Sequence, residues 1–396
     1  MFRKRSATPP NPRLLWPVLV SFMVLALPTQ GFETKATSAF VIDQSTGTVL
    51  LSKNADVPLP PASMSKLMTL YVAFEALKDG RLRLDEKLPV SQYAMSLGGS
   101  TMFLDTTDRV SVEDLLRGII VLSGNDACVV IAEALSPDGT EAGFARIMNE
   151  RARQIGLKNT NLVNASGWPA PNHRMSMRDL ATLADRLITD FPRYYPWFAE
   201  QEFGFDGRAP MNSRNRNPLL GLDIGADGLK TGHTQEAGYS LVGSATQGDR
   251  RTIFVIAGLE SVRERAEEAE AIIGWSFRQF QAKTIAKAGT QFAEVDVWRG
   301  ELAKVNLIAA NDVEALLPIL NGDSLIGEVI YDNPIEAPIS AGQEIGKLVF
   351  TAGNLPQVTV PLVADRSVGS GGILAQFIAA ARILFRKVQT TAESAI

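Results

Sequence analysis

Strand-like patterns open and close the longest domain of this chain, and helix-like patterns fill the section between them. Residues 39–43 and 48–52 are β-rich runs on either side of a turn sequence, which predicts an antiparallel hairpin. Strand-like runs return at 239–245 and 252–259, before a helical pattern at 265–280. One sheet must therefore draw its strands from both ends of the domain and pack against helices. The helices expected in the intervening section include 63–78, 111–122 and 127–135.

Beyond a boundary near residues 281–289, the chain changes to short apolar runs at close and regular spacing. The predicted fold is an α/β (α+β) domain over 35–283, with an antiparallel sheet flanked by helices, and then a small all-β domain over 287–364. A glycine- and serine-rich stretch at 365–372 predicts a linker. Strands of the second domain are expected at 292–300, 304–310, 325–332, 344–352 and 357–363.

The first 31 residues have the order of a secretory signal peptide, with a basic segment before an apolar run at 14–27. That run is shorter than the about 20 residues of a membrane-spanning helix, and Pro17 and Pro28 weaken it as a permanent anchor. No clear small-residue cleavage site precedes Phe32, so a retained N-terminal anchor stays open as the alternative. Export follows from both interpretations.

A second membrane contact is predicted near the C-terminus. Residues 373–388 place apolar side chains at helical three-and-four spacing, with Arg382, Arg386 and Lys387 on much of the opposite side. This pattern is typical of an amphipathic helix that lies in the membrane plane. A helix packed back on the protein has the same apolar stripe and is the alternative, but the linker and the cationic residues favour lipid.

Composition excludes some functions and restricts others. The formal net charge of −4, with 39 basic against 43 acidic residues, provides no broad cationic field for nucleic acid. The single cysteine, Cys128, cannot form an internal disulfide, so the exported chain must be stabilised by its core. Cys128 lies in an apolar run without a nearby histidine, which predicts a buried, inert thiol rather than a nucleophile.

Three short motifs in a fixed order carry the predicted chemistry: Ser63-Met-Ser-Lys66, Ser123-Gly-Asn125 and Lys230-Thr-Gly232. Each motif is weak by itself. A Ser-x-x-Lys match is expected about once by chance in a chain of this length. The second motif could merely cap the helix that follows it, and the third could be a plain edge strand. Their combination is what points to catalysis.

The first motif can form an activated nucleophile. At a helix start, the three-residue separation places Lys66 on the same face as Ser63, one turn along. A serine hydroxyl attacks poorly unless a base removes its proton, and a lysine can be that base only if burial and nearby cations lower its pKa. Lys230 is a candidate for such a cation. The positive end of the helix dipole near Ser63 would stabilise developing negative charge.

A histidine-dependent mechanism has little support, because the chain holds only two histidines and neither lies in a nucleophile-elbow sequence. His173 lies in a polar turn sequence and is predicted to be a solvated loop residue. His233 directly follows the third motif. Residues 225–240 contain too many glycines for a helix interior and predict a strand with turns on both sides. Gly232 in this strand would let another backbone, such as a substrate peptide, approach closely.

The segments around these motifs resemble the low-molecular-mass D-alanyl-D-alanine carboxypeptidases, a group of penicillin-binding serine peptidases. The resemblance covers roughly residues 37–390 and implies a β-lactamase-like catalytic domain, a β domain and a membrane-anchoring tail. It also implies removal of the terminal D-alanine from peptidoglycan stem peptides through an acyl-enzyme, inhibition by β-lactams, and no cofactor or metal. The segments that carry it are PASMSKLMT, SGNDACVVIAEA, GLKNTN, GLKTGHTQEAGYSLV and RAEEA.

The resemblance assigns a role to each motif residue. Ser63 is implied to be the acylated nucleophile and Lys66 its general base. Thr231 and Arg265 are implied to hold the terminal carboxylate of the substrate, and the backbone N–H groups of Ser63 and His233 to form the oxyanion hole. The remaining residues implied to line the site and to assist proton transfer or substrate placement are Ser123, Asn125, Lys230 and Gly232.

Two further expectations follow. His233 is predicted to orient the site through Asp179. The enzyme is expected to be peripheral, on the periplasmic face of the bacterial inner membrane.

Two other functions stay open: a β-lactamase, and a catalytically idle peptidoglycan-binding scaffold. A class A β-lactamase has a deacylating glutamate with an asparagine four residues later, and no acidic residue between Asn125 and Lys230 shows this Glu-x-x-x-Asn spacing. An idle scaffold is disfavoured because the three catalytic motifs are intact.

Overall fold

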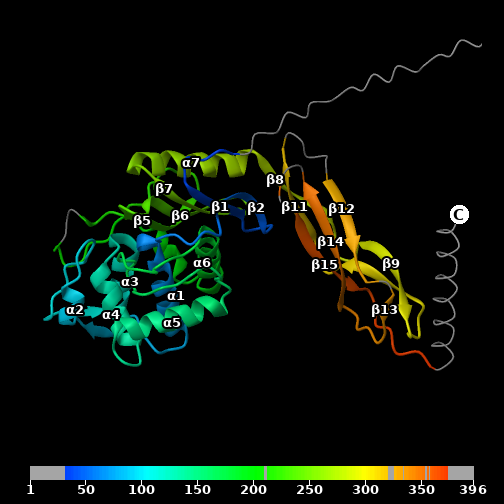
Figure 1. Ribbon diagram of the computed structural model, residues 1–396, viewed down its shortest axis with the longest axis horizontal. Helices are drawn as coiled ribbons and strands as arrows, with labels where there is room; N and C mark the ends of the chain where they lie inside the picture. Colours follow the sequence, from blue (N-terminus) through cyan, green and yellow to red (C-terminus); the bar gives the residue numbers. More distant parts are fainter. Residues whose placement is uncertain are drawn as a thin grey trace, which may run out of the picture. The chain divides into compact units, whose positions relative to one another are not determined.

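The computed structural model describes residues 32–208, 212–319, 325–332, 334–352, 355 and 357–372. The predicted signal peptide at 1–31 and the predicted amphipathic helix at 373–388 lie outside these residues. Within the described ranges, no helix combines the length and the apolar character needed to cross a membrane. An α/β domain with an antiparallel sheet and an all-β region follow each other along the chain, which confirms the predicted fold class (Figure 1).

The sheet of the first domain draws its strands from both ends of that domain, as predicted. Its strands are β1 (Ser38–Asp43), β2 (Thr48–Lys53), β5 (Ala226–Thr234), β6 (Gly238–Gln247) and β7 (Arg250–Leu259). Their order is β2-β1-β7-β6-β5, and all neighbouring pairs are antiparallel. The predicted hairpin is formed by β1 and β2, and β1 pairs along its length with β7. β5, which carries the third motif, is an edge strand of the sheet.

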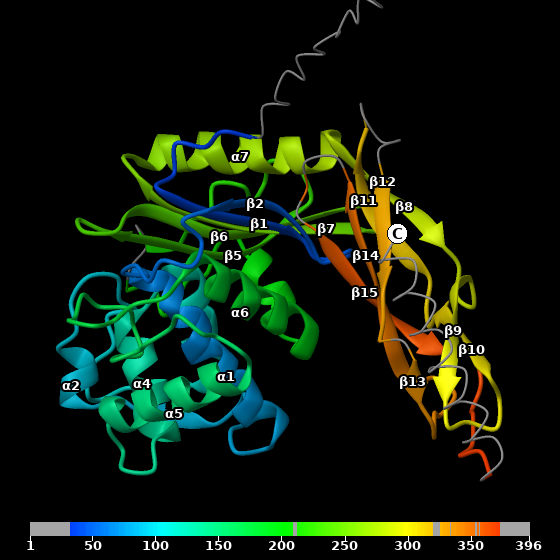
Figure 2. The same ribbon diagram turned by 45° about the vertical axis from the view of Figure 1, so that its right-hand side comes forward.

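Helices cover both faces of this sheet. α7 (Val262–Arg278) lies on one face, and α1 (Lys66–Lys78) lies with the other helices on the opposite face (Figures 1 and 2). Neighbouring residues of β7 pack into different cores: Val255 joins the core that contains α1, and Ile256 joins apolar residues of α7. Because successive strand side chains point to opposite faces, a strand covered on both sides is apolar at nearly every position.

The predicted helices form, with local differences. The helix expected at 63–78 begins as a 3-10 turn (Ala62–Ser65) before α1 continues it. The helix expected at 111–122 is α3 (Val112–Arg117) followed by a π-helical segment (Gly118–Leu122). The remaining elements of this domain are β3 (Lys87–Pro89), α2 (Gln92–Met95), β4 (Arg109–Ser111), α4 (Asn125–Leu135), α5 (Glu141–Gln154), α6 (Met177–Asp190) and a 3-10 turn (Tyr195–Ala199).

The all-β region contains the five predicted strands and others that the sequence pattern did not predict. The elements are β8 (Phe280–Ala286), β9 (Gln291–Trp298), β10 (Lys304–Ala309), β11 (Val313–Pro318), β12 (Leu325–Ile330), β13 (Ile335–Glu336), β14 (Glu344–Ala352) and β15 (Val358–Ala364). One sheet has the order β12-β14-β15-β10-β9-β13, and β11 pairs separately with β8. Buried residues alternate with exposed or half-buried ones in β10, as expected for a strand with one face toward the core.

Two details of the predicted domain limits differ in the structure. The expected boundary at 281–289 falls on β8, which pairs with β11 of the all-β region. The expected linker at 365–372 is ordered against that region, because Val368 is fully buried and pairs with Ile339. Ser370 also pairs with Gly300. Small, polar residues at the surrounding positions suggested a linker, whereas the single apolar side chain within them joins the core.

Candidate active site

The first motif forms a tight turn that leads into a helix. Ala62 and Ser63 belong to the 3-10 turn, and Lys66 is the first residue of α1. Ala62 has a φ of 47°, a left-handed conformation that costs energy in a residue with a Cβ atom. The half-buried Ser63 lies beside Lys66, whose Nζ atom is 2.9 Å from Ser63 Oγ. The expected contact between the two side chains is therefore present.

Lys66 is fully buried, yet none of its hydrogen-bond partners in the described part of the chain is a carboxylate. Besides Ser63, its ammonium donates to Asn125 Oδ1 at 2.7 Å and to the carbonyl oxygen of Ser166. Burial, with a smaller contribution from the charge of Arg216, lowers the pKa of Lys66 to about 8. A substantial neutral fraction is thus available near physiological pH, which a general base requires.

The second motif connects the π-helical segment to α4. Ser123 has a φ of 63°, and its buried Oγ atom has no hydrogen-bond partner among the described residues. Asn125 uses both ends of its amide, because Oδ1 accepts from Lys66 while Nδ2 donates to the carbonyl of Gly98 at 2.8 Å. Neither side chain caps α4, since the N-cap residue is Gly124. The capping alternative is therefore wrong, and the Ser123 hydroxyl is left for another partner.

The third motif places a second buried lysine on the edge strand β5. Lys230 is 3% exposed, and burial together with the charges of Lys66 and Arg216 holds its pKa well below the usual range. Thr231 follows it in the strand and is also buried. The positive charge of Lys66 contributes to this lowered pKa. Two motifs far apart in the sequence thus supply cations whose charges act on each other.

Gly232 allows a close contact within the protein. A Cβ atom there would lie 2.8 Å from Ser240 Oγ and 3.1 Å from both Met64 Cγ and the carbonyl oxygen of Pro61. The missing side chain therefore lets β5 pack directly against the turn that carries Ser63. This internal contact is a further reason for glycine at this position, and the expectation that Gly232 gives room to a substrate backbone stays a prediction.

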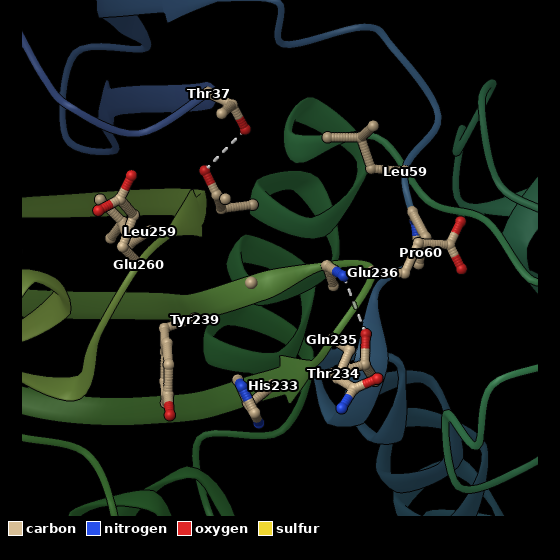
Figure 3. Close-up of a pocket in the computed structure, with 14 residues that line it drawn as sticks. Thr37, Leu59, Pro60, His233, Thr234, Gln235, Glu236, Tyr239, Leu259 and Glu260 are labelled. Carbon is tan, nitrogen blue, oxygen red and sulfur yellow. Dashed lines mark hydrogen bonds between the residues drawn. The ribbon is translucent and has the colours of Figure 1, made fainter.

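His233 is exposed and stacks on Tyr239, with ring centroids 4.0 Å apart. Figure 3 shows the two rings projecting side by side from the β5–β6 hairpin, at the edge of a cavity of about 520 Å³ that Glu236 and Glu260 also line. The predicted link from His233 to Asp179 is wrong. The Asp179 carboxylate instead accepts hydrogen bonds from the backbone of residues 158 and 159 and from a threonine hydroxyl.

Arg265 lies in the first turns of α7 and is 4% exposed. Its Nη2 atom donates to the carbonyl oxygen of Arg216 at 3.1 Å, and its guanidinium lies 5.9 Å from the ring centroid of Tyr239. The Nε atom has no hydrogen-bond partner among the described residues. Burial lowers the pKa of Arg265 to about 10, so the group stays charged at neutral pH. A buried cation with a free donor is suited to bind an anionic ligand.

Three contributors to the site were missed from the sequence. Arg216 bonds Ser100 Oγ and the carbonyl of Leu122, and it acts on both buried lysines. The carbonyl of Ser166 holds Lys66, but any residue type can supply a carbonyl, so no sequence signal exists for it. Gly167 is required next to it, because a Cβ atom there would lie 1.9 Å from the carbonyl oxygen of Ala62.

His173 is buried, which corrects the prediction of a solvated loop residue. It is 2% exposed, accepts a hydrogen bond from the backbone N–H of Val163 at 3.1 Å, and lies 3.0 Å from Ser65 Oγ through Nε2. Burial lowers its pKa to about 4. The polar residues around it do form a turn, but the imidazole points inward. Cys128, by contrast, is buried as predicted, and burial raises its thiol pKa to about 12, which confirms an inert side chain.

The site combines a serine hydroxyl, a buried amine of lowered pKa beside it, and further cations nearby. This arrangement is typical of a serine-type hydrolase whose general base is a lysine, whereas many other serine hydrolases use a histidine.

Comparisons with known proteins lead to the same class. Residues 25–261 match the model of the peptidase S11 family, D-alanyl-D-alanine carboxypeptidase, and residues 280–370 match the model of the penicillin-binding protein 5 C-terminal domain. The D-alanyl-D-alanine carboxypeptidase DacC of Escherichia coli is 36% identical, over 89% of this chain and 91% of that protein. The chain belongs to the D-alanyl-D-alanine carboxypeptidase family, and it is a serine-type hydrolase.

Solved structures agree. Penicillin-binding protein 5 from Haemophilus influenzae is 34% identical and superposes with a TM-score of 0.76, covering 86% of this chain and 99% of that one. Penicillin-binding protein D2 from Listeria monocytogenes, in its ampicillin-bound form, is 31% identical with a TM-score of 0.57 over 63% of this chain and 100% of that one. The second likeness lies in a protein solved with a β-lactam bound.

Proposed function

We propose that this enzyme removes the terminal D-alanine from peptidoglycan stem peptides through an acyl-enzyme on Ser63. The observation that carries the proposal is the contact of 2.9 Å between Ser63 Oγ and the buried Nζ atom of Lys66, whose pKa is lowered to about 8. A neutral amine there accepts the hydroxyl proton as the oxygen attacks the carbonyl carbon of the penultimate D-alanine.

The other two partners of Lys66 aim its lone pair. When the ammonium loses one proton, two N–H bonds remain for Asn125 Oδ1 and the carbonyl of Ser166. The lone pair then points at the third neighbour, Ser63 Oγ. With a pKa of about 8, roughly a tenth of the lysine is in this form at pH 7. Burial and fixed acceptors thus make the amine both available and oriented.

The remaining residues act on the substrate in this proposal. The backbone N–H groups of Ser63 and His233 bind the oxyanion, and Ser123 passes a proton to the departing amine under the influence of Lys230. Thr231 and Arg265 bind the terminal carboxylate. The orphaned hydroxyl of Ser123 and the free Nε atom of Arg265 support these assignments. A β-lactam acylates Ser63 by the same route, since its carbonyl takes the place of the peptide carbonyl.

The test combines two assays on purified full-length protein. A peptide ending in D-Ala-D-Ala should release D-alanine, and penicillin should form a covalent adduct that mass spectrometry maps to Ser63. Ser63→Ala is the control and should lose both reactions. An adduct without D-alanine release would support the scaffold alternative, and rapid hydrolysis of penicillin with no peptide turnover would support a β-lactamase. No adduct on the wild-type protein would overturn the proposal.

We also propose that the enzyme works at the periplasmic face of the inner membrane, held there by the predicted amphipathic helix at 373–388. A chain ended after Gly372 should become soluble and keep its peptide hydrolysis. Ending it after Arg366 would be a poor test, because Val368 is buried in the all-β region. If the protein ended at Gly372 still sediments with membranes, the helix is not the anchor.

A further inference from the structure

Three extended segments lie side by side next to the catalytic turn. Leu59, four residues before Ser63, exchanges two backbone hydrogen bonds of 2.9 Å with Met175. On the other side, Arg174 exchanges bonds of 2.8 and 2.9 Å with Asn161, five residues before Ser166. The middle segment therefore runs between the part of the chain that leads to the nucleophile and the part that leads to the carbonyl bonded to Lys66.

His173 stands at the start of this middle segment, and its imidazole contacts both neighbours. The backbone N–H of Val163 donates to Nδ1 at 3.1 Å, so Nδ1 carries no proton. The proton of the neutral ring is then on Nε2, which donates to Ser65 Oγ at 3.0 Å. The Ser65 hydroxyl donates its own proton to the carbonyl oxygen of Ala62 at 3.0 Å. Every donor and acceptor in this chain of hydrogen bonds is used.

This series of hydrogen bonds ends at Ala62, the residue of the catalytic turn that has a strained backbone. Ala62 has a φ of 47°, and its carbonyl accepts a hydrogen bond from Ser65 while Gly167 packs closely against it. A left-handed residue that is not glycine persists only when its surroundings hold it. The conformation of Ala62 sets the direction in which the next residue, Ser63, leaves the turn.

We infer that His173 is a positioning residue for acylation: one neutral imidazole fixes both the turn that presents Ser63 and the segment whose Ser166 carbonyl holds Lys66. The inference rests on the proposed role of Ser63 and adds a residue outside the three motifs. His173 touches neither the nucleophile nor the base. It acts through Ser65 on one side and through Val163 on the other.

The electrostatic setting keeps this imidazole neutral. Burial is the main cause of its lowered pKa of about 4, and the nearby cations Lys66 and Arg174 act in the same direction. A proton on Nδ1 would face the N–H of Val163 and break that contact. The ring is therefore a fixed donor and acceptor across the pH range in which Lys66 titrates.

The test measures the rate constant for acylation by penicillin in full-length variants, with adduct formation followed by mass spectrometry. His173→Phe keeps a ring but removes both hydrogen bonds and should slow acylation about 10- to 100-fold, the usual penalty for a misplaced catalytic group. His173→Asn keeps an acceptor near Val163, and His173→Gln keeps a donor near Ser65, so each should recover part of the rate. The control is Thr252→Val, which loses a buried hydrogen bond to Ser276 away from the site and should acylate normally.

A double-mutant cycle separates positioning from loss of stability. Because His173 and Ser65 act in series, Ser65→Ala combined with His173→Phe should be little slower than the slower single variant. Independent, fully additive losses would contradict the inference, as would wild-type acylation by His173→Phe. If the wild-type protein itself takes up no penicillin, the proposed function fails instead.

A second measurement is made on the wild-type protein, with one variant used only to assign the signals. The chain has only two histidines, so a ¹H–¹⁵N spectrum of the imidazole nitrogens of the wild-type protein contains two sets of signals. One should stay neutral with the proton on Nε2 from pH 8 to pH 5, and His233→Asn assigns the other. A His173 signal with the proton on Nδ1, or one that titrates near pH 6.5, overturns the inference.

Discussion

Lysine side chains lie in opposite environments in the α/β domain and in the all-β region. In the all-β region, Lys304 pairs with Glu294 and Lys287 pairs with Asp312, and these side chains are between about 40% and 75% exposed. In the α/β domain, Lys66 and Lys230 are buried, and the partners of Lys66 are a hydroxyl, an amide oxygen and a carbonyl. Exposed pairs contribute little to stability, whereas a buried cation without a carboxylate is costly.

The difference separates structure from chemistry. A fold under selection for stability alone would replace a buried, unpaired lysine by an apolar residue, because desolvation of the charge opposes folding. Lys66 and Lys230 lie on separate elements and have pKa values lowered by burial, and perturbed groups of this kind are typical of functional sites. The following predictions test this contrast, starting with the largest expected effect.

Lys66→Met should lower the rate constant for penicillin acylation by about 10²- to 10⁴-fold, the range expected when a general base is lost. The free energy of unfolding should change by no more than about 2 kcal/mol, because relief of the buried amine opposes the loss of hydrogen bonds to Asn125 and Ser166. Mass spectrometry and urea unfolding measure the two effects. A large loss of stability that accompanies the loss of rate would mean that Lys66 is mainly structural.

Acylation should accelerate as the pH rises toward 8. The pKa of Lys66 is lowered to about 8, so its neutral, reactive fraction grows roughly 50-fold between pH 6 and pH 8 and then levels off. Second-order rate constants for penicillin, measured across this range, report the titration in the free enzyme. A rate that is flat from pH 6 to pH 8, or that falls, would exclude a neutral lysine as the base.

Gly232→Ala should slow acylation about tenfold and lower the free energy of unfolding by about 1–3 kcal/mol, because the new methyl group pushes against the catalytic turn at Met64 and Pro61. The matched control is Gly327→Ala in the exposed strand β12. A Cβ atom there would meet its nearest neighbour at 3.7 Å, so its stability should change by less than about 0.5 kcal/mol. Equal effects of the two substitutions would contradict the packing role of Gly232.

Val368→Ala should destabilise the all-β region by about 1–3 kcal/mol and leave the acylation rate unchanged, because this fully buried side chain lies outside the catalytic domain. Urea unfolding and penicillin labelling of the same sample separate the two. An unchanged unfolding curve would favour a linker at 365–372 after all.

Lys304→Met should have the smallest effect. Its ion pair with Glu294 is half-exposed, so the free energy of unfolding should change by less than about 1 kcal/mol and the acylation rate not at all. Set beside Lys66→Met, it is the same chemical change in the other environment. If Lys304→Met also lost acylation, the catalytic function would not depend on the buried lysines of the α/β domain alone, and the contrast between the two regions would fail.

The fold was predictable where the pattern of apolar residues has a single interpretation. The strands β1, β2, β6 and β7 and the helix α1 follow directly from periodicity, and the three motifs by themselves locate Ser63, Lys66 and Lys230. β11 was missed because its sequence, VEALLP, does not alternate strictly between apolar and polar residues and contains few strand-favouring residue types. The pairing of β8 with β11 depends on contacts that a local pattern does not contain.

The site was predictable in its motif residues and in Arg265, which the family resemblance supplied. His173 was misplaced because turn-forming neighbours describe the backbone around it but not the direction of its side chain. The Ser166 carbonyl and Arg216 were missed because each acts through a position in space rather than through a recognisable spacing. Gly232 was found, but its packing role was missed, since the crowding at Met64 arises only when the two elements are packed together.

The left-handed backbone of Ser123 limits which residues can ever occupy this position. Glycine would accept a φ of 63° without strain but would remove the hydroxyl. Threonine would keep the hydroxyl, yet its branched Cβ atom makes that backbone conformation a true outlier. Asparagine tolerates the conformation but replaces the hydroxyl with an amide. Each of these three substitutions should therefore give up either the small hydroxyl or the backbone conformation that serine combines here.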